Sequence, residues 1–386
     1  MVHPVYAQMP PTIFDEMSGL ARQHSAINLG QGFPDAPGPL PILQAAAEAL
    51  LTGSNQYPPS IGLPALRQAA AAHYRRTQGL DLDWQTQVVV TSGATEAIAS
   101  ALLALVQAGD EVGLIQPLYD AYLPLVRRAD GIARFATLSP PDWRLTGEVL
   151  DQLFSPRTKV VVLNNPMNPC ARVFDDDELG LLAQYCVRHD VIAICDDVWE
   201  AVVPPPQRFK SLMAFPGMAG RTVKIGSAGK MFGLTGWKVG LMMASPDLAN
   251  AVARAHQFLT FTTPPNLQTA VAYGLNEMRG WFTDMPNQMG RSRDHLAASM
   301  TKQGFAVLPS QATYFLNVDL AASGIAISDR DFCLRCVIDH GVAAIPLSAL
   351  YEQDPQMSLI RLCFAKPDET LDEGARRLGA ARAALA

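Results

Sequence analysis

A chain of 386 residues, of which 49% are hydrophobic and 17% charged, is long enough for two or three domains and can bury a large core. The net charge of −6 comes without any basic block, which argues against nucleic acid as the main partner. No apolar run approaches the ~20 residues that span a bilayer, and residues 1–6 lack the features of a signal peptide.

The six cysteines are scattered, and their spacing shows no disulfide framework. Cys333 and Cys336 form a lone C-x-x-C. We interpret it as two thiols one helical turn apart, because no second pair is present to complete a zinc site. The sequence therefore predicts no metal and a reducing compartment, the cytoplasm.

In chain order, residues 1–45 are predicted to form an arm with a short helix at 12–22 and an extended segment from Ile27. Helices then follow at 64–77, 95–106, 119–129 and 175–189. Short apolar strands are predicted at 87–90, 111–115, 159–163 and 191–195, with the strand at 222–225 closing the series. Continuous apolar strands that alternate with helices are typical of a mostly parallel sheet covered on both faces. We expect residues 46–289 to form this large α/β domain.

After the last of these strands, a long helical region is predicted from Pro246 to about Ala297. The remainder shows a hairpin-like alternation around 313–318, further helices and a strand at 359–364. This pattern indicates a smaller α+β domain, residues 290–386, which the N-terminal arm joins.

The most informative stretch is 225–240, where Lys230 stands among small residues and is followed by a second cation, Lys238. Small neighbours let a ligand lie close to the backbone, and a lysine in a dry place can lose its proton and attack an aldehyde. A glycine-rich loop with a solvated lysine would have the same appearance. A Walker A loop is excluded, because Met231 rather than serine or threonine follows the lysine.

Further polar residues follow the predicted strands, where ligands bind in open parallel sheets. Residues 91–96 open a helix with glycine and small residues, which exposes unpaired backbone N–H groups to an anion. Asn168 supplies an amide donor, and Asp196 supplies a carboxylate just beyond an apolar strand. Each segment alone also fits an ordinary helix start or turn, and Asp197 competes with Asp196 for the carboxylate role.

With these stretches in place, the chain resembles the fold-type I, pyridoxal-phosphate-dependent aminotransferases of class I/II over nearly all of its length. Within that class it is most similar to the methionine aminotransferase and kynurenine aminotransferase (glutamine transaminase K) group. The shared stretches are 28–35, 55–57, 235–240 and 341–346. The resemblance implies an α/β fold with a mostly parallel central sheet in a large domain, a smaller α+β domain, and pyridoxal phosphate as the cofactor.

The resemblance also implies roles for individual residues. Lys230 would bind the cofactor as a Schiff base and move the proton, Asp196 would bond the ring nitrogen, and Arg361 would clamp the substrate α-carboxylate beside Gly32. The cofactor phosphate would be contacted by Ala94, Thr95, Ser227, Lys238 and the neighbouring subunit's Tyr57. Tyr119 would stack on the cofactor ring. Asn168 and Trp199 would contact O3′, and Asn168 would also reach the substrate. Trp199 departs from the group, which usually has tyrosine there, so Asn168 is expected to be the main O3′ donor.

The implied function is exchange of an amino group between an amino acid, methionine or an aromatic one favoured, and a 2-oxo acid by a ping-pong route. The implied active unit is a homodimer without nucleic-acid or membrane partners. One alternative is a pyridoxal-phosphate-dependent cysteine-S-conjugate β-lyase, because the same chemistry can eliminate from Cβ. Another is an aminotransferase-like regulator or pseudo-enzyme that binds the cofactor without turnover.

Overall fold

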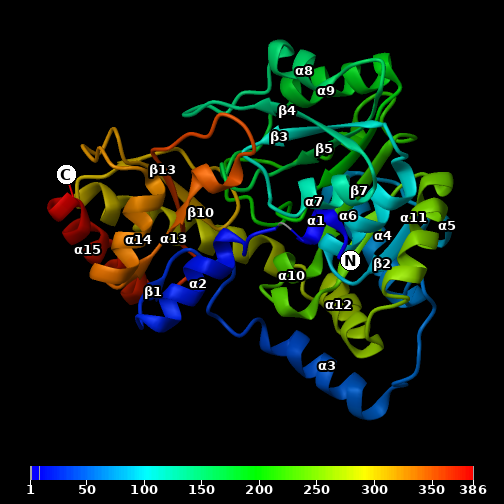
Figure 1. Cartoon of the computed structure of the whole chain (residues 1–386). Helices are drawn as coiled ribbons and strands as arrows, with labels where there is room; N and C mark the ends of the chain where they lie inside the picture. The colour runs from blue at the N-terminus through cyan, green and yellow to red at the C-terminus, as the bar shows by residue number, and fades with distance from the viewer. Residues whose placement is uncertain (1, 8, 386) are drawn as a thin grey trace.

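A seven-stranded sheet forms the centre of the larger part of the molecule in the computed structural model, which describes residues 2–7 and 9–385. Its strands lie in the order β2–β8–β7–β6–β5–β3–β4, and Figure 1 labels β2, β7, β5, β3 and β4 of this sheet. Their bounds are β2 Val88–Thr91, β3 Glu111–Gln116, β4 Ile132–Thr137, β5 Thr158–Asn164, β6 Ile192–Asp196, β7 Thr222–Ser227 and β8 Gly240–Met243. The α/β fold class with a mostly parallel sheet is confirmed.

The expectation that the strand at 222–225 closes the series was wrong. β8 follows it and runs antiparallel between β7 and β2. Its four residues are buried, and the strand forms by backbone pairing with both neighbours. The sequence of the strand alone does not show this pairing. β4 was also not predicted: it is an edge strand, half exposed, and its sequence mixes arginine with apolar residues.

Helices cover both faces of this sheet, so its central strands are buried on both sides. In β5, Val161 packs into a cluster with α8 and α9, while Val160 and Val162 pack into a cluster with α6, α7 and α11. The helices as far as residue 277 are α1 Pro4–Ala7, α2 Ile13–Gln23, α3 Leu40–Thr52, α4 Pro64–Gln78, α5 Trp84–Gln87, α6 Ala94–Leu105, α7 Tyr122–Arg128, α8 Gly147–Leu153, α9 Asp176–His189, α10 Ala228–Met231, α11 Pro246–Leu259 and α12 Pro265–Glu277. Short 3-10 turns lie at Leu212–Ala214, Thr235–Trp237 and Leu347–Leu350.

Local sequence signals explain where several helices begin and end. α9 starts with a capping box in which the Asp175 side chain accepts from the Glu178 N–H and Glu178 reaches back to the Asp175 N–H. α4 begins at Pro64 and ends at Gly79, which adopts the left-handed conformation. The helical region predicted from Pro246 is split into α11, α12 and α13 (Trp281–Lys302).

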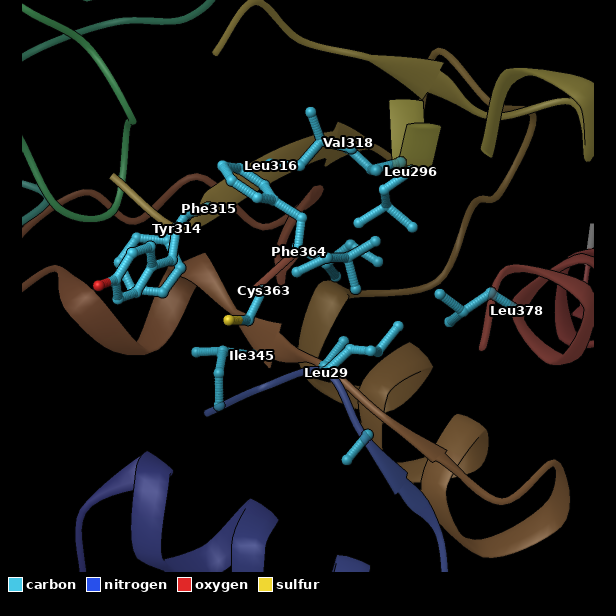
Figure 2. Packing of buried hydrophobic residues seen from close by; sticks show 14 of the residues in the cluster. Leu29, Leu296, Tyr314, Phe315, Leu316, Val318, Ile345, Cys363, Phe364 and Leu378 are labelled. Atoms are coloured by element: carbon cyan, nitrogen blue, oxygen red, sulfur yellow. The ribbon is translucent and has the colours of Figure 1, made fainter. Parts of the chain in front are cut away.

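The smaller part is built on a four-stranded antiparallel sheet in the order β12–β13–β10–β9. Its strands are β9 Ala306–Val307, β10 Phe315–Asp319, β12 Ile345–Pro346 and β13 Leu359–Cys363, and α14 Asp329–Asp339 and α15 Asp368–Leu385 accompany them. Side chains from all of these join one hydrophobic cluster with Leu29 of the N-terminal arm. Figure 2 labels some of its members, among them Leu316 of β10, Cys363 of β13 and Leu378 of α15. The arm is held there by β1 (Ile27–Asn28), which pairs in parallel with β11 (Val342–Ala343).

The expected domain boundaries remain a prediction. Residue 45 lies inside α3, and residues 289 and 290 lie inside α13, so each boundary would fall within a helix. None of the helices described is both long and apolar enough to cross a membrane.

Candidate active site

A cavity of about 230 Å³ lies beyond the carboxyl ends of the parallel strands, and we call it the inner cavity. Its lining includes nine residues that the sequence singled out: Ala94, Thr95, Tyr119, Asn168, Asp196, Trp199, Ser227, Lys230 and Lys238. A second, more open cavity of about 570 Å³, here called the vestibule, shares several of these residues and adds Gly32 and Arg361. The structure therefore gathers eleven predicted residues from remote parts of the chain into one region.

Tyr57 is the predicted residue that the chain does not bring to this region. It lines neither cavity and is 84% exposed, with its ring edge-on to Phe261 at 5.4 Å between centroids. A single chain therefore leaves Tyr57 on the surface.

Lys230 lies in α10, a single helical turn that follows β7. Ser227 caps this turn, because its Oγ accepts the Lys230 backbone N–H at 3.3 Å. The Lys230 ammonium donates to the Gly32 carbonyl at 3.0 Å and lies 4.4 Å from the centre of the Trp199 ring. Burial, together with the positive charges of Arg361 and Lys238, lowers the Lys230 pKa to about 8. The side chain is thus an amine that can lose its proton near neutral pH.

Asp196 is the last residue of β6 and is 4% exposed. Its Oδ2 accepts a hydrogen bond from the Tyr122 hydroxyl, while its buried Oδ1 has no partner among the described residues. Burial raises the Asp196 pKa to about 6, and the Tyr122 hydrogen bond opposes that rise. A buried carboxylate oxygen without a donor is costly unless a ligand supplies one.

Asp197, the competing carboxylate, faces a different environment. Its Oδ2 accepts from the Lys224 ammonium at 2.7 Å and from the Ser211 hydroxyl at 3.3 Å. It lines neither cavity. The geometry therefore favours Asp196 over Asp197 as the carboxylate that meets a ligand.

The N-terminus of α6 faces the inner cavity through Ala94 and Thr95. Gly93 precedes it with φ +83, and a side chain there would collide with Lys238, because a Cβ atom would lie 2.9 Å from Lys238 Cε. Lys238 thus lies across the start of the helix, where the first backbone N–H groups have no partners within the helix. This combination of N–H groups and one ammonium is suited to a phosphate.

Arg361 is central in β13 and only 1% exposed. Its Nη1 donates to Asn168 Oδ1 at 2.7 Å and its Nη2 to the Gly30 carbonyl at 2.9 Å, while Nε has no partner among the described residues. Its guanidinium carbon lies 3.9 Å from the centre of the Phe315 ring and 5.0 Å from that of Phe14. Burial lowers the Arg361 pKa to about 10. The buried Arg361 guanidinium has only neutral hydrogen-bond acceptors, so it can still bind a carboxylate.

Trp199 is 3% exposed and packs edge-on against Tyr314 and Phe315, at 4.9 and 5.2 Å between ring centroids. No hydrogen bond from its indole N–H is found in the part of the chain that the structure describes. The helix predicted at 119–129 begins three residues later, at Tyr122, so Tyr119 lies in the turn before α7. It lines both cavities and contacts Tyr122 edge-on at 5.6 Å.

Sequence reasoning missed several residues of this region. Tyr122 carries no signal of its own, since a tyrosine in a first helical turn is usually a core residue. Asn164, which lines the inner cavity and whose Oδ1 accepts from the Asn168 N–H at 2.7 Å, directly follows the predicted strand at 159–163 but was not singled out. Asp120 lies next to the predicted Tyr119 and lines the vestibule.

Comparison with known proteins gives the same picture over almost the whole chain. The family model "Aminotransferase class I and II" matches residues 24–378. A probable N-succinyldiaminopimelate aminotransferase of Mycobacterium tuberculosis is 43% identical over 379 residues, covering 95% of each chain. A solved structure of an N-succinyldiaminopimelate aminotransferase from Mycobacterium tuberculosis superposes with a TM-score of 0.95 at 41% identity, covering 99% of this chain and 100% of that one. The methionine aminotransferase of Escherichia coli is 39% identical over 371 residues (96% of each chain), and kynurenine–oxoglutarate transaminase 1 of Mus musculus is 34% identical over 397 residues (94% of this chain, 93% of that one).

Proposed function

The chain belongs to the aminotransferase class I and II family, and from that premise we propose that it transfers the amino group of methionine or an aromatic amino acid to a 2-oxo acid by a ping-pong route. It is an aminotransferase, and the family uses pyridoxal phosphate. The relatives named above act on three different kinds of donor at comparable identity, so the donor has to be inferred from the site of this chain.

The lining of the vestibule is the observation that carries the choice of donor. Among the described residues that line it, the cations are Lys230 and Arg361, and no further lysine or arginine is placed for a distal carboxylate. Its walls are otherwise largely apolar, with Met9, Phe14, Phe33, Pro124, Leu125 and Phe315. Burying a thioether or an aromatic ring here is favourable, whereas N-succinyldiaminopimelate would place two further carboxylates against these walls.

The residues of the inner cavity fit pyridoxal phosphate. The unpartnered Asp196 Oδ1 can accept a hydrogen bond from a protonated ring nitrogen, and the start of α6 with Lys238 and Ser227 can hold a phosphate. When bound, the cofactor supplies an aldehyde that carries the amino group and a ring that withdraws electrons from the substrate Cα.

Lys230 is the proton carrier in this proposal. Its pKa of about 8 leaves a useful fraction of neutral amine at physiological pH, so that Nζ can take the Cα proton and return it. The hydrogen bond from Nζ to the Gly32 carbonyl holds the amine at the boundary between the inner cavity and the vestibule. Asp196, which is buried and accepts a hydrogen bond from the Tyr122 hydroxyl, would supply the negative charge that keeps the ring nitrogen protonated.

Arg361 is the group that would orient the substrate. Its guanidinium already donates to Asn168 and Gly30, and a substrate α-carboxylate would be a stronger acceptor for the same fork. The rings of Phe14 and Phe315 shield the Arg361 guanidinium from water, so its ion pair with the substrate carboxylate would be desolvated. Binding of that carboxylate would hold the substrate Cα within reach of Lys230.

We propose a homodimer as the active unit. Tyr57, 84% exposed, packs edge-on against Phe261, which is 40% exposed, and Phe258, three residues earlier in the chain, is 86% exposed. Large exposed apolar groups in proximity mark protein–protein contacts, and a second copy would let Tyr57 reach the neighbouring phosphate. The six cysteines are free and buried, which suits a reducing compartment, and we propose the cytoplasm.

A matrix of amino-acid donors against 2-oxo-acid acceptors tests the proposal. Methionine, phenylalanine, tyrosine and kynurenine should give the highest kcat/KM, and N-succinyldiaminopimelate a value at least about tenfold lower. The same wells should be assayed for pyruvate released from a cysteine S-conjugate, which reports β-elimination. Preferential use of N-succinyldiaminopimelate would overturn the assigned donor, and elimination faster than transfer would overturn the reaction.

A further inference from the structure

One carboxylate in the vestibule is not used by the proposed reaction. Asp120 follows β3 in the turn that precedes α7, next to the ring of Tyr119. It is the only acidic side chain among the described residues that line the vestibule. The walls around it include Pro124 and Leu125, so the carboxylate stands in a largely apolar surface.

Asp120 is half-buried, and across residues 2–7 and 9–385 no side chain forms a hydrogen bond or ion pair with it. Burial raises the Asp120 pKa, and the charge of Arg361 and the backbone N–H groups of Asp120 and Ala121 oppose that rise. Arg361 is close enough for this electrostatic effect but too far for an ion pair. The negative charge of Asp120 is therefore directed at the space that a substrate occupies.

The route of a substrate side chain follows from the two cations. A donor whose α-carboxylate is bound by Arg361 and whose α-amine faces Lys230 has used both positive charges of the vestibule. Its side chain has to extend into the remaining volume, which Asp120 lines. A second carboxylate placed there meets a like charge across a poorly solvated gap, without a cation to offset it.

We propose that Asp120 is a specificity-determining residue that discriminates against amino donors bearing a carboxylate on the side chain. A neutral thioether, ring or amide incurs no such repulsion, and an amide N–H can even donate to the carboxylate. This inference rests on the proposed function, because it takes the orientation of the donor from the roles of Arg361 and Lys230.

The test compares two inert ligands of the holoenzyme that differ in one charge. Glutaramate and glutarate have nearly the same shape, but glutarate carries a second carboxylate in place of an amide. The wild-type enzyme should bind glutaramate at least about tenfold more tightly than glutarate by titration calorimetry. Asp120→Asn should bring the two dissociation constants to within about threefold of each other. Asp120→Ser, which removes the same charge without adding an amide, should act in the same direction.

Asp81→Asn is the matched control, because Asp81 is a surface carboxylate whose side chain is 86% exposed beside Arg75. It should leave the ratio of the two dissociation constants unchanged. A ratio that also stays unchanged in Asp120→Asn and Asp120→Ser would overturn the inference and assign Asp120 to the structure of the turn.

A turnover measurement separates this inference from the proposed function. The kcat/KM for glutamate relative to glutamine should rise about tenfold in Asp120→Asn, whereas a role in folding alone would lower both donors together. If the wild-type enzyme does not turn over methionine or aromatic donors, the proposed donor class fails, but the ligand titration still decides the role of Asp120. If methionine is turned over and neither ratio moves, only the inference about Asp120 fails.

Discussion

Lys224 and Lys230 lie close together in the chain, but their surroundings are opposite. Lys224 is near Asp197, and Lys230 is near the adjacent Asp196. Lys224 in β7 has a side chain that is 0% exposed and donates to Asp197 at 2.7 Å and to Glu200 at 2.6 Å. Although burial lowers the Lys224 pKa, these carboxylates raise it above its ordinary value. Lys230 donates only to a neutral carbonyl, and burial lowers its pKa to about 8.

The carboxylates differ in the same way. Glu200 accepts from Lys224, from the Tyr74 hydroxyl at 2.7 Å and from the Gln78 amide at 2.6 Å, so both of its carboxylate oxygens have donors. Asp196 keeps one oxygen without a donor. Buried charges that are paired with one another hold the fold, whereas a charged group with an unpaired atom beside a cavity is positioned for a ligand. We therefore assign structure to the Lys224 cluster and chemistry to Lys230 and Asp196.

Removing the amine at Lys230 is the sharpest way to test this division. Lys230→Ala should lower the rate of transamination by roughly 10³-fold or more, because no other described amine lies at the junction of the cavities. After borohydride reduction, mass spectrometry should find no cofactor attached to a lysine of the variant. An adduct on another lysine, with activity retained, would place the nucleophile elsewhere.

Lys224→Met should act on stability instead. It leaves Asp197 and Glu200 buried without their counter-charge, which typically costs about 3–5 kcal/mol. Urea denaturation of the cofactor-free protein measures the loss. Lys230→Met is the matched control, and since Lys230 has no carboxylate partner its free energy of unfolding should change much less. Equal destabilisation by both substitutions would contradict the division.

The adjacent aspartates allow a second paired test. Asp196→Asn should slow transamination by roughly 100-fold, because an amide cannot hold the ring nitrogen protonated as a carboxylate does. Its effect on unfolding should be small. Asp197→Asn should show the reverse, a loss of stability with a smaller loss of rate. If Asp197→Asn slowed the reaction more than Asp196→Asn, the wrong aspartate would have been assigned.

The smallest expected effect is a difference in titration between the two lysines. In the cofactor-free protein, labelling of Lys230 by an amine-directed reagent should increase with pH around a midpoint near 8. Because this pKa lies below the usual 10.5, the folded chain binds fewer protons than the unfolded chain between these values, so the contribution of Lys230 to stability rises with pH in that window. Lys224 should stay unlabelled there, and a Lys230 midpoint near 10.5 would contradict the expected shift.

The sequence predicted the strands whose residues are apolar on both faces. It did not predict the strands that depend on pairing with their neighbours. β2, β3, β5, β6 and β7 read as apolar runs because helices cover both sides of the sheet. β4 and β8 did not, since one is a half-exposed edge and the other is defined by antiparallel neighbours.

In the candidate site, Lys230 stood out because it follows a predicted strand and lies among small residues. The roles of most other residues, including Tyr119 and Arg361, came from the resemblance to the family. Their contacts could not be predicted: Arg361 bonds Asn168 from a distant segment, and Tyr122 reaches Asp196 only through the fold. The expectation that Asn168 rather than Trp199 is the main O3′ donor remains a prediction.

The pairing of β1 with β11 bears on the order in which the protein can assemble during synthesis. Ile27 pairs with Val342 and Asn28 with Ala343, and the Cys363 N–H donates to the Leu29 carbonyl. At the usual elongation rates the ribosome needs on the order of half a minute to make the chain between these segments. Throughout that time the N-terminal arm has no partner strand, and Gly30 has no Arg361 to bind. The substrate end of the site is thus assembled after translation of the last strand, and a nascent chain stalled before β13 would contain Lys230 and Asp196 but no carboxylate clamp.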